Sequence, residues 1–308
     1  MTIEILEPGP LTSAQDAFGR TQWRHLGVPV GGAADAWSAR LANRLVGNPD
    51  GAALLEVTLG EAVIATDAAA WTALTGGLSA SIGGVELPGH EAWRLRAGAT
   101  LRIHAGHGAR GYLAVAGGLI VDDVLGSPST DLRTGFGGLD GRALRVGDRL
   151  VVGPSTGDPN RWTGSTATGP IRIVAGPHPE FMSALEADWT VAVEADRTGV
   201  RLDGPMLEGG EVPSMGLPVG AIQVPPDGRP IVMLADRPVT GGYRVPACVI
   251  RADIGRVAQL RSGDMVRFAS VSIGQARAAF QLTERELDAL EPLGNGEGDA
   301  LAWAGSHD

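Results

Sequence analysis

The sequence predicts a mainly β fold, a β-rich α+β protein with a few short helices. Glycine supplies 46 and proline 20 of the 308 residues without a collagen-like period, so these residues punctuate many short elements. Several segments between them are short, rich in β-branched and apolar residues, and typical of strands. The clearest of these strand-like segments are residues 62–66, 100–104, 111–116, 171–174 and 230–234.

Two segments predict helices. In residues 35–47 apolar side chains recur every four positions, Asp35 suits the N-cap, and Gly47 suits the position just after the helix. A second helical pattern covers residues 275–290, near the C-terminus. We expect these helices to accompany sheets rather than to form a helical bundle.

A short pattern, Leu-Arg-x-Gly followed by alternating apolar residues, occurs three times. The copies begin at Leu95, Leu144 and Leu260, and each predicts a glycine-containing turn that leads into a strand. The Pro- and Gly-rich stretch 153–169 is the best candidate for a linker. We therefore expect three parts, listed here by residue range: an N-terminal β-rich domain (1–165), a C-terminal β-barrel domain (166–272), and a helical C-terminal segment with a tail (273–308).

The charged residues exclude several classes of function. The net charge is −10, from 35 acidic and 25 basic residues, and all 25 basic residues are arginine because the sequence contains no lysine. Without lysine, this chain can carry no pyridoxal phosphate Schiff base, no P-loop and no covalent biotin. An acidic chain without a basic run also argues against a nucleic-acid partner.

Cysteine, histidine and hydropathy exclude further classes. A single cysteine, Cys248, excludes an internal disulfide, and its apolar neighbours indicate a buried structural thiol. The pair His104 and His107 has no further ligands that the sequence identifies, so we expect no metal site. No run is apolar enough to span a membrane, and the N-terminus lacks signal-peptide features, so we expect a cytoplasmic protein with no membrane partner.

Four polar, glycine-rich segments, residues 15–20, 194–201, 220–228 and 234–243, are the candidates for a functional site. In two of them an Asp-Arg dipeptide follows a probable strand. An arginine can bind a carboxylate or phosphate with two hydrogen bonds, and an adjacent aspartate can orient it or act as a base. The alternative is that each Asp–Arg pair only fixes a turn. Because lysine is absent, an anionic ligand would be held by arginine, backbone amides or a metal.

These polar segments are part of a longer pattern that runs colinearly over about residues 3–270. It comprises residues 9–20, 27–35, 42–48, 55–58, 112–118, 124–130, 195–199, 222–228 and 234–243. In this order the segments resemble the KipA-type carboxyltransferase subunits, the family of the C subunit of ATP-dependent 5-oxoprolinase. The same family is known as allophanate hydrolase subunit 2 or urea amidolyase-related protein.

The candidate site residues lie in these segments. Asp196, Arg197, Asp236 and Arg237 are the candidate catalytic residues. The candidate ligand-binding residues are Asp16, Arg20, Asp35, Asn43, Gln223, Gly241, Gly242 and Tyr243.

The resemblance implies two cyclophilin-like β-barrel halves and a heteromeric complex. The implied partners are a KipI-like B subunit and a LamB/YcsF-type A subunit. The implied ligands are ATP with Mg²⁺, bound at a subunit interface, and a small lactam or amide substrate. The implied reaction is the ATP-driven opening of 5-oxo-L-proline to L-glutamate, with the isolated chain inactive.

Two alternatives stay open on the sequence. The first is a carboxyltransferase that moves CO₂ from carboxybiotin to a urea-like amide, with the biotin carried by another protein because this chain has no lysine. The second is a non-enzymatic KipA-type regulator that acts on a kinase inhibitor.

Overall fold

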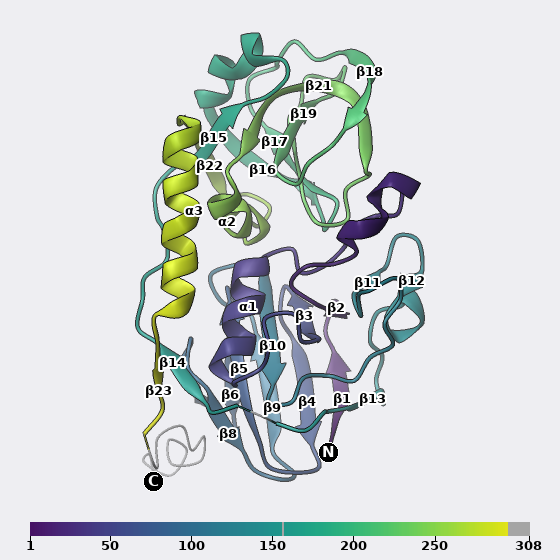
Figure 1. Ribbon diagram of the computed structural model, residues 1–308, viewed down its shortest axis with the longest axis vertical. Helices are drawn as coiled ribbons and strands as arrows, with labels where there is room; N and C mark the ends of the chain where they lie inside the picture. The colour runs from purple at the N-terminus through teal and green to yellow at the C-terminus, as the bar shows by residue number, and fades with distance from the viewer. Residues whose placement is uncertain (156, 295–308) are drawn as a thin grey trace. The chain divides into compact units, whose positions relative to one another are not determined.

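Strands make up most of the regular structure in the computed structural model, which describes residues 1–155 and 157–294 (Figure 1). About 38% of the described residues are in strands and 17% in helices, so the mainly β prediction is confirmed. All five segments predicted as strands contain a strand, because their short apolar runs end at Gly, Pro or Asp.

The chain forms two compact units. Among the described residues, one comprises Met1–Gly19, Asp35–Gly164 and residues 287–294, and the other comprises Arg20–Ala34 and Ser165–Glu286. The chain passes from the first unit to the second next to residue 165, where the sequence suggested a boundary.

The structure divides the chain differently from the sequence-based ranges in two places. Residues 20–34 join the second unit, where Ala34 packs in the hydrophobic core. Residues 273–286 also join the second unit rather than a separate segment. Neither association is encoded by local sequence patterns, since both depend on contacts with distant strands. The last part of the expected tail, residues 295–308, lies outside the described residues.

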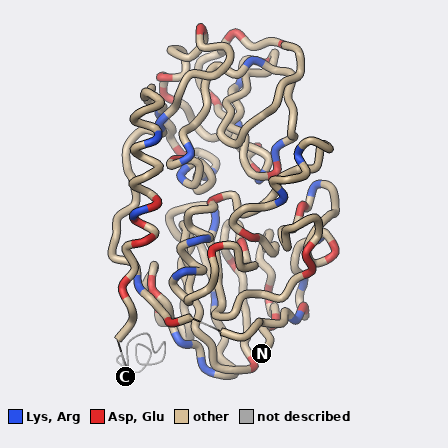
Figure 2. Tube along the Cα trace, in the orientation of Figure 1, with Lys and Arg blue, Asp and Glu red and all other residues tan. Residues whose placement is uncertain are grey.

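Arginine and acidic residues are interspersed along the chain in both units (Figure 2). Many of them pair, as in Arg142 with Asp148 at 2.7 Å and Arg172 with Asp253 at 2.6 Å. The Asp253 carboxylate is fully buried, and Arg172 binds both of its oxygens. Because burial without a partner destabilises a charge, each such pair fixes the position of both residues.

The second unit contains a closed barrel of seven strands. Neighbours around the ring pair in the order β15-β22-β16-β17-β20-β19-β21, and β21 pairs with β15 to close it. A further strand, β18 (Glu211–Gly216), pairs with β21 outside the ring. The ring strands are β15 (Ile171–Ala175), β22 (Met265–Ser270), β16 (Asp188–Ala195), β17 (Gly199–Asp203), β20 (Ile231–Met233), β19 (Ala221–Val224) and β21 (Thr240–Val249).

Large apolar side chains fill the barrel. Trp189, Leu202, Ile222 and Phe268 come from four different strands and are buried together. The indole N–H of Trp189 donates to the carbonyl of Leu185 at 2.8 Å, so its one polar group is satisfied. The candidate residues Arg197, Asp236 and Arg237 lie outside these strands, in the loops that connect them.

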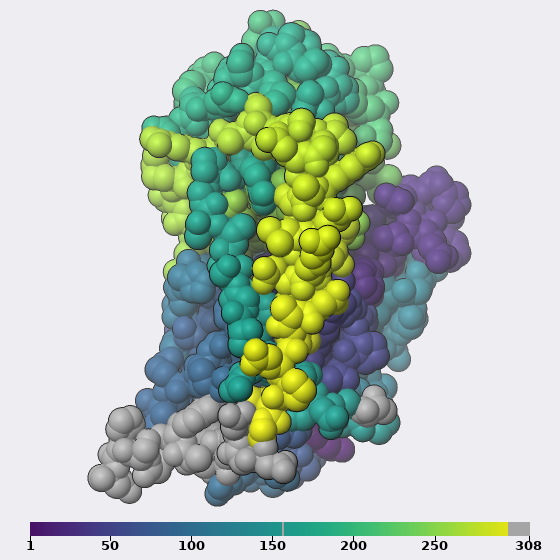
Figure 3. Space-filling model, turned by 60° about the vertical axis from the view of Figure 1, so that its left-hand side comes forward, coloured from purple at the N-terminus to yellow at the C-terminus, as the bar shows by residue number. Residues whose placement is uncertain are grey.

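Short helices cover parts of the second unit. They are η1 (Thr21–Leu26), η3 (Pro179–Glu186), η4 (Arg251–Asp253), α2 (Ile254–Ala258) and most of α3 (Ile273–Asp288). Helix α3 runs along the surface beside the segment that leads into β15 (Figure 3). It begins with a capping box, because Ser272 Oγ accepts from the Gln275 N–H at 3.2 Å and Gln275 Oε1 accepts from the Ser272 N–H at 2.8 Å.

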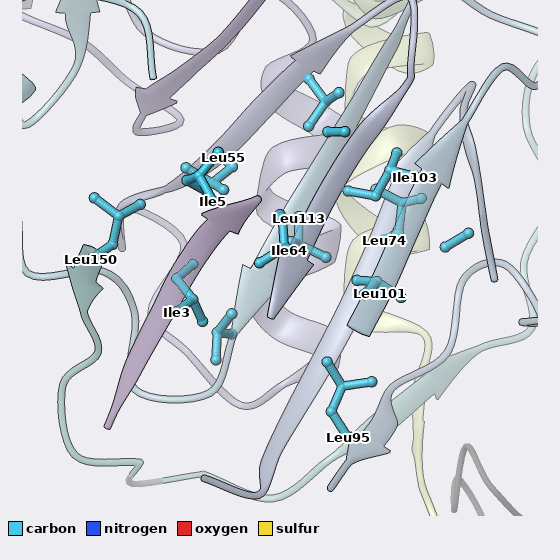
Figure 4. Packing of buried hydrophobic residues seen from close by; sticks show 14 of the residues in the cluster. Ile3, Ile5, Leu55, Ile64, Leu74, Leu95, Leu101, Ile103, Leu113 and Leu150 are labelled. Carbon is cyan, nitrogen blue, oxygen red and sulfur yellow. The ribbon is translucent and has the colours of Figure 1, made fainter. Parts of the chain in front are cut away.

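The first unit packs two antiparallel sheets around one core (Figure 4). Ile5, Ile64 and Leu101 of one sheet and Leu55 and Leu113 of the other are buried in it. One sheet has the order β13 (Arg149–Val151), β1 (Thr2–Pro8), β4 (Ala62–Thr66), β9 (Thr100–His104), β6 (Ser79–Ile82), β7 (Val85–Glu86). The other has the order β2 (Leu11–Gln15), β3 (Leu54–Thr58), β10 (Arg110–Val115), β5 (Ala70–Gly76), β8 (Trp93–Leu95).

Helix α1 (Ala36–Leu45) packs on the five-strand sheet, against β5 and β10. Its N-cap is the predicted Asp35, whose Oδ1 accepts from the Ser38 N–H at 3.0 Å. Gly47 follows the helix with a φ of 74°, a left-handed conformation that favours glycine. The remaining short elements of this unit are β11 (Thr130–Asp131), β12 (Phe136–Gly137), η2 (Leu139–Gly141), β14 (Asn160–Trp162) and β23 (Leu290–Pro292).

The three predicted glycine turns are present. Gly98, Gly147 and Gly263 have φ values of 78°, 85° and 90°, each at the third position of its turn. In every copy the residue after the glycine donates its N–H to the carbonyl of the arginine at the start of the turn, at 3.0–3.1 Å. The turns lead directly into β9, β13 and β22, so the same type of glycine-containing turn precedes a strand in both units.

Candidate functional site

Arg197 and Asp236 form a buried ion pair in the second unit. Arg197 lies in the turn between β16 and β17, and Asp236 lies just after β20. Arg197 Nε donates to Asp236 Oδ2 at 2.8 Å, and its Nη2 donates to Asp236 Oδ1 at 2.9 Å. Each residue is only 5% exposed. A bidentate pair with this geometry is among the strongest side-chain interactions in a protein.

The pair joins three segments of the second unit. Arg197 Nη2 also donates to the carbonyl of Gly32 at 2.6 Å, which holds the segment 20–34 against the barrel. The Asp236 N–H donates to the Arg197 carbonyl at 2.9 Å, so the backbones of the two loops are also bonded. This geometry matches the alternative interpretation of the sequence, in which an Asp–Arg pair fixes a turn. Arg197 and Asp236 are therefore best described as positioning residues.

Asp196 orients the turn that presents Arg197. Its exposed carboxylate accepts from the N–H groups of Thr198 at 2.7 Å and Gly199 at 3.0 Å. Aspartate commonly closes a turn in this way, through a local hydrogen bond to the backbone two residues on. The side chain thus supports the loop.

Arg237, the next residue after the ion pair, has a different environment. It is 7% exposed, and its hydrogen bonds go to carbonyls: Nε to Leu217 at 2.9 Å and Nη1 to Leu234 at 3.3 Å. Burial lowers the pKa of Arg237 to about 10, and the nearby Arg24 cation contributes to the same shift. Within the described part of the chain, no carboxylate neutralises this guanidinium.

Gln223 and Gly241 lie beside each other in the second unit. Gln223, on β19, is 4% exposed, and its Nε2 finds no hydrogen-bond acceptor among the described residues. Gly241, on β21, lies so close that a Cβ on it would meet Gln223 Nε2 at 2.4 Å. Glycine is therefore required there by close approach. Gly242 follows it, and Tyr243 is partly exposed on the same strand.

Three of the predicted ligand-binding residues lie in the first unit and make structural contacts there. Asp16 Oδ1 accepts from the Gly19 N–H at 2.7 Å and from Ser129 Oγ at 2.8 Å. Asp35 caps α1. Asn43 Nδ2 donates to the carbonyl of Ala52 at 2.9 Å and fixes the loop after α1.

Tyr112 contacts the backbone of the N-cap of α1. Its Oη accepts from the Asp35 N–H at 2.8 Å. The tyrosine is fully buried, and this burial raises its pKa well above the usual value, with the Glu56 and Asp35 charges adding to the effect. The phenol therefore stays neutral and fixes the start of the helix.

The second unit also holds Arg20, which is buried at the residue before η1. Its N–H donates to the Val30 carbonyl at 2.7 Å. Sequence reasoning missed Arg24 and Leu217, which surround Arg237. The signal for Arg24 was present, since residues 17–34 contain arginine and histidine but no acidic residue. Leu217 acts through its backbone carbonyl, which no sequence pattern identifies.

His104 and Cys248 lie outside the four polar segments that hold the candidate site residues. His104 Nε2 lies 3.0 Å from Glu86 Oε1, and no group of three or more His, Cys, Asp or Glu among the described residues could hold a metal ion. Cys248 is half-buried on β21, and burial raises the pKa of its thiol. No helix in the described chain is long and apolar enough to cross a membrane.

The model of the carboxyltransferase domain, subdomain A and B, matches residues 26–270 of this sequence. The chain belongs to this carboxyltransferase family. The matched range includes Arg197, Asp236, Arg237 and Gln223. The resemblance found in the sequence is thereby confirmed.

The chain is similar to two proteins of comparable length and to part of a much longer one. The chain is 38% identical to the C subunit of the 5-oxoprolinase of Escherichia coli (strain K12), over 94% of this chain and 97% of that protein. It is 33% identical to the corresponding 5-oxoprolinase C subunit of Haemophilus influenzae, over 94% of this chain and 98% of that protein. The urea amidolyase of Saccharomyces cerevisiae is 33% identical over 94% of this chain, which spans 18% of that longer protein.

Solved structures of the family are larger than this chain. The structure of TTHA0988 is 41% identical with a TM-score of 0.77, over 87% of this chain and 56% of that one. The Kluyveromyces lactis urea carboxylase structure is 29% identical with a TM-score of 0.85, over 96% of this chain and 30% of that one. The chain thus spans just over half of the first of these solved chains and about a third of the second.

Proposed function

We propose that this chain is the C subunit of an ATP-dependent 5-oxoprolinase, which opens the lactam of 5-oxo-L-proline to give L-glutamate. The observation that carries the proposal is the match with the C subunit of the Escherichia coli 5-oxoprolinase along nearly the whole of both chains. The proposed partners are a KipI-like B subunit and a LamB/YcsF-type A subunit. In this proposal the isolated chain is inactive, and the complex acts in the cytoplasm.

The chemistry explains why an arginine-rich chain suits this reaction. A lactam carbonyl is a poor electrophile, and ATP supplies the activation that lets water open the ring. Substrate and product both carry carboxylates, and the activated species carries additional negative charge. Fixed cations and N–H donors that face such charges stabilise them in a site from which water is excluded. In this chain Arg237 is the buried cation whose charge no carboxylate among the described residues balances.

Asp196 and Asp236, the acidic candidate catalytic residues, do not form a site for Mg²⁺-ATP on this chain alone. Asp196 accepts two backbone N–H groups, and Asp236 is held by Arg197. No cluster of metal-ligating side chains is found among the described residues. We therefore propose that ATP and Mg²⁺ are held mainly by partner subunits at an interface, and we assign this chain no step in ATP chemistry.

A second function is favoured by one specific observation. The urea carboxylase structure superposes on 96% of this chain with a TM-score of 0.85, so this chain has the scaffold of a carboxyltransferase domain. A carboxyltransferase role would require carboxybiotin on a separate protein, because no lysine is available here.

Hydrolysis of ATP by the purified chain with its A- and B-type partners distinguishes the two functions. The 5-oxoprolinase proposal predicts ATP hydrolysis that depends on 5-oxoproline and on all three proteins, and that urea does not stimulate. Each protein alone serves as the control. Hydrolysis that urea and bicarbonate stimulate, together with a biotinylated partner, would contradict the proposal and support carboxyl transfer.

A further inference from the structure

Arg237 is an unusual arginine for this chain, because its neighbours supply a second positive charge and no negative one. Paired guanidiniums elsewhere in the described chain, such as Arg172 with Asp253, bind carboxylates directly. Arg237 donates instead to the carbonyls of Leu217 and Leu234 through Nε and Nη1. Its third nitrogen, Nη2, donates to no described residue. A cation that is 7% exposed and lacks a counterion is costly to bury, unless an anion from outside completes it.

Gln223 supplies a second unused donor on the same side of the barrel. Its Nε2 is buried and has no acceptor among the described residues, although an amide nitrogen has two N–H groups to donate. Leaving a buried donor unsatisfied destabilises a fold, and each such group in a native structure calls for a physical explanation. An acceptor brought by a ligand would satisfy it.

Arg237 and the Gln223 amide both lie close to Leu217. Arg237 Nε bonds to the backbone carbonyl of Leu217, and the side chain of Leu217 lies 3.2 Å from the position of a Cβ on Gly241. That same Cβ position is 2.4 Å from Gln223 Nε2. Leu217 thus contacts Arg237 through its backbone carbonyl and lies beside the Gln223 amide through its side chain. The absence of a side chain at Gly241 leaves room for the amide of Gln223.

A second cation lies near Arg237. Arg24 lies on η1, is exposed, and is close enough to Arg237 to lower the pKa of that guanidinium. Basic positions on η1 and on the neighbouring barrel loops can be followed in Figure 2. Two like charges repel each other, so their proximity is unfavourable until a negative charge lies between or beside them.

We propose that Arg237, Gln223 and Arg24 form a binding site for a small oxyanion, either a carboxylate or a phosphoryl group. Arg237 supplies the buried charge, the Gln223 amide supplies a neutral N–H donor, and the exposed Arg24 adds positive charge nearby. The Leu217 and Leu234 carbonyls hold the guanidinium in place. The site belongs to the second unit alone, so the isolated full-length chain is sufficient to bind the anion.

Thermal unfolding of the full-length chain at constant ionic strength tests the site. The probes are 5-oxo-L-proline and acetate as carboxylates, inorganic phosphate as the phosphoryl group, and 2-pyrrolidinone as the same lactam without a carboxylate. We expect at least one oxyanion to raise Tm by about 2 °C or more at about ten times its Kd, while 2-pyrrolidinone and added NaCl do not. The probe with the larger effect identifies which oxyanion the site prefers.

Three variants assign the effect to the site. R237Q removes the buried cation, and Q223E places a carboxylate where the anion would lie without changing the volume of the side chain. R267Q is the matched control, because Arg267 is an exposed arginine of the same unit that pairs with Asp188. We expect R237Q and Q223E to lose the Tm response, and R267Q to keep it. If R237Q does not fold, the Tm response of Q223E alone tests the proposal.

Two results would overturn the proposal. One is a wild-type chain on which none of the oxyanions has a larger effect than NaCl. The other is a folded Q223E variant that responds to the oxyanions as the wild type does. Neither result depends on turnover, so the site can stand when the 5-oxoprolinase proposal fails, and the reverse also holds.

Discussion

The Arg197–Asp236 pair illustrates how one contact organises several segments. Residues 39 positions apart in the sequence share two hydrogen bonds because β17 and β20 pair in antiparallel register, with Gly199 opposite Met233. The turn before β17 and the loop after β20 therefore end side by side. Arg237 follows directly, so the position of the unbalanced cation depends on this neighbouring ion pair.

Removing the cation of this pair should destabilise the second unit strongly. R197M leaves the Asp236 carboxylate buried without its partner, which costs about 3–5 kcal/mol of unfolding free energy. The double variant R197M/D236L removes both charges and should recover part of the loss. Urea unfolding at neutral pH measures both values, and R201M, at a more exposed ion pair of the same unit, is the control. A loss for R197M no larger than for R201M would show that the pair does not hold the loops together.

At the scale of elements, the glycine turns explain how several strands begin. Gly263 has a φ of 90°, and no described atom outside the adjoining residues lies within 4 Å of the position that a Cβ would take. Only backbone strain therefore opposes a larger residue there. G263A should therefore cost about 1–2 kcal/mol, and G263N should cost less because asparagine tolerates this conformation better. Unfolding of the two variants in urea checks this order. Equal stability of G263A and the wild type would contradict the strained-turn explanation.

The C-terminal half of α1 is tied to the following loop by a charge cluster. Asp50 accepts from Arg40 Nε at 2.8 Å and from Arg44 Nε at 2.6 Å. Burial opposes ionisation of Asp50, but hydrogen bonds from Arg44 and Arg40 outweigh it and lower its pKa below the usual value.

This shift predicts a pH dependence of stability. The folded-state pKa of Asp50 lies below its unfolded value of about 3.9. Ionised Asp50 therefore adds to the free energy of unfolding above that pH. This contribution is lost as the pH falls toward the folded-state pKa of Asp50. D50N should therefore lose less stability than the wild type between about pH 5 and about pH 3. Urea midpoints at the two pH values measure the difference. An identical loss in D50N would show that Asp50 is not the group responsible.

The sequence predicted those elements whose structure depends on residues close to them in the chain. The N-cap at Asp35, the strands at residues 62–66 and 100–104, and the glycine turns each depend on neighbours within a few positions. Helix α3 was predicted, but its start at Ile273 depends on the Ser272–Gln275 capping box, which the apolar pattern did not identify.

At the scale of the whole molecule, the fold class could be predicted and the division into units only partly. The passage near residue 165 coincides with a change in composition, whereas the association of Arg20–Ala34 with the barrel depends on Arg197 and on core packing of Ala34. For the proposed anion site, the sequence offered Arg237 and Gln223 as candidates because of their residue types and polar surroundings. It could not show which arginines have carboxylate partners, because those partners are set by strand register and loop packing.

Formation of L-glutamate from 5-oxo-L-proline by the assembled three-protein complex tests the account most directly. The comparison uses complexes that contain the wild-type chain, Q223E, R267Q, or no such chain. The account predicts activity that requires this chain, survives in R267Q and is lost or strongly reduced in a folded, assembled Q223E complex. Activity that is the same without this chain, or the same in Q223E as in the wild type, would contradict it.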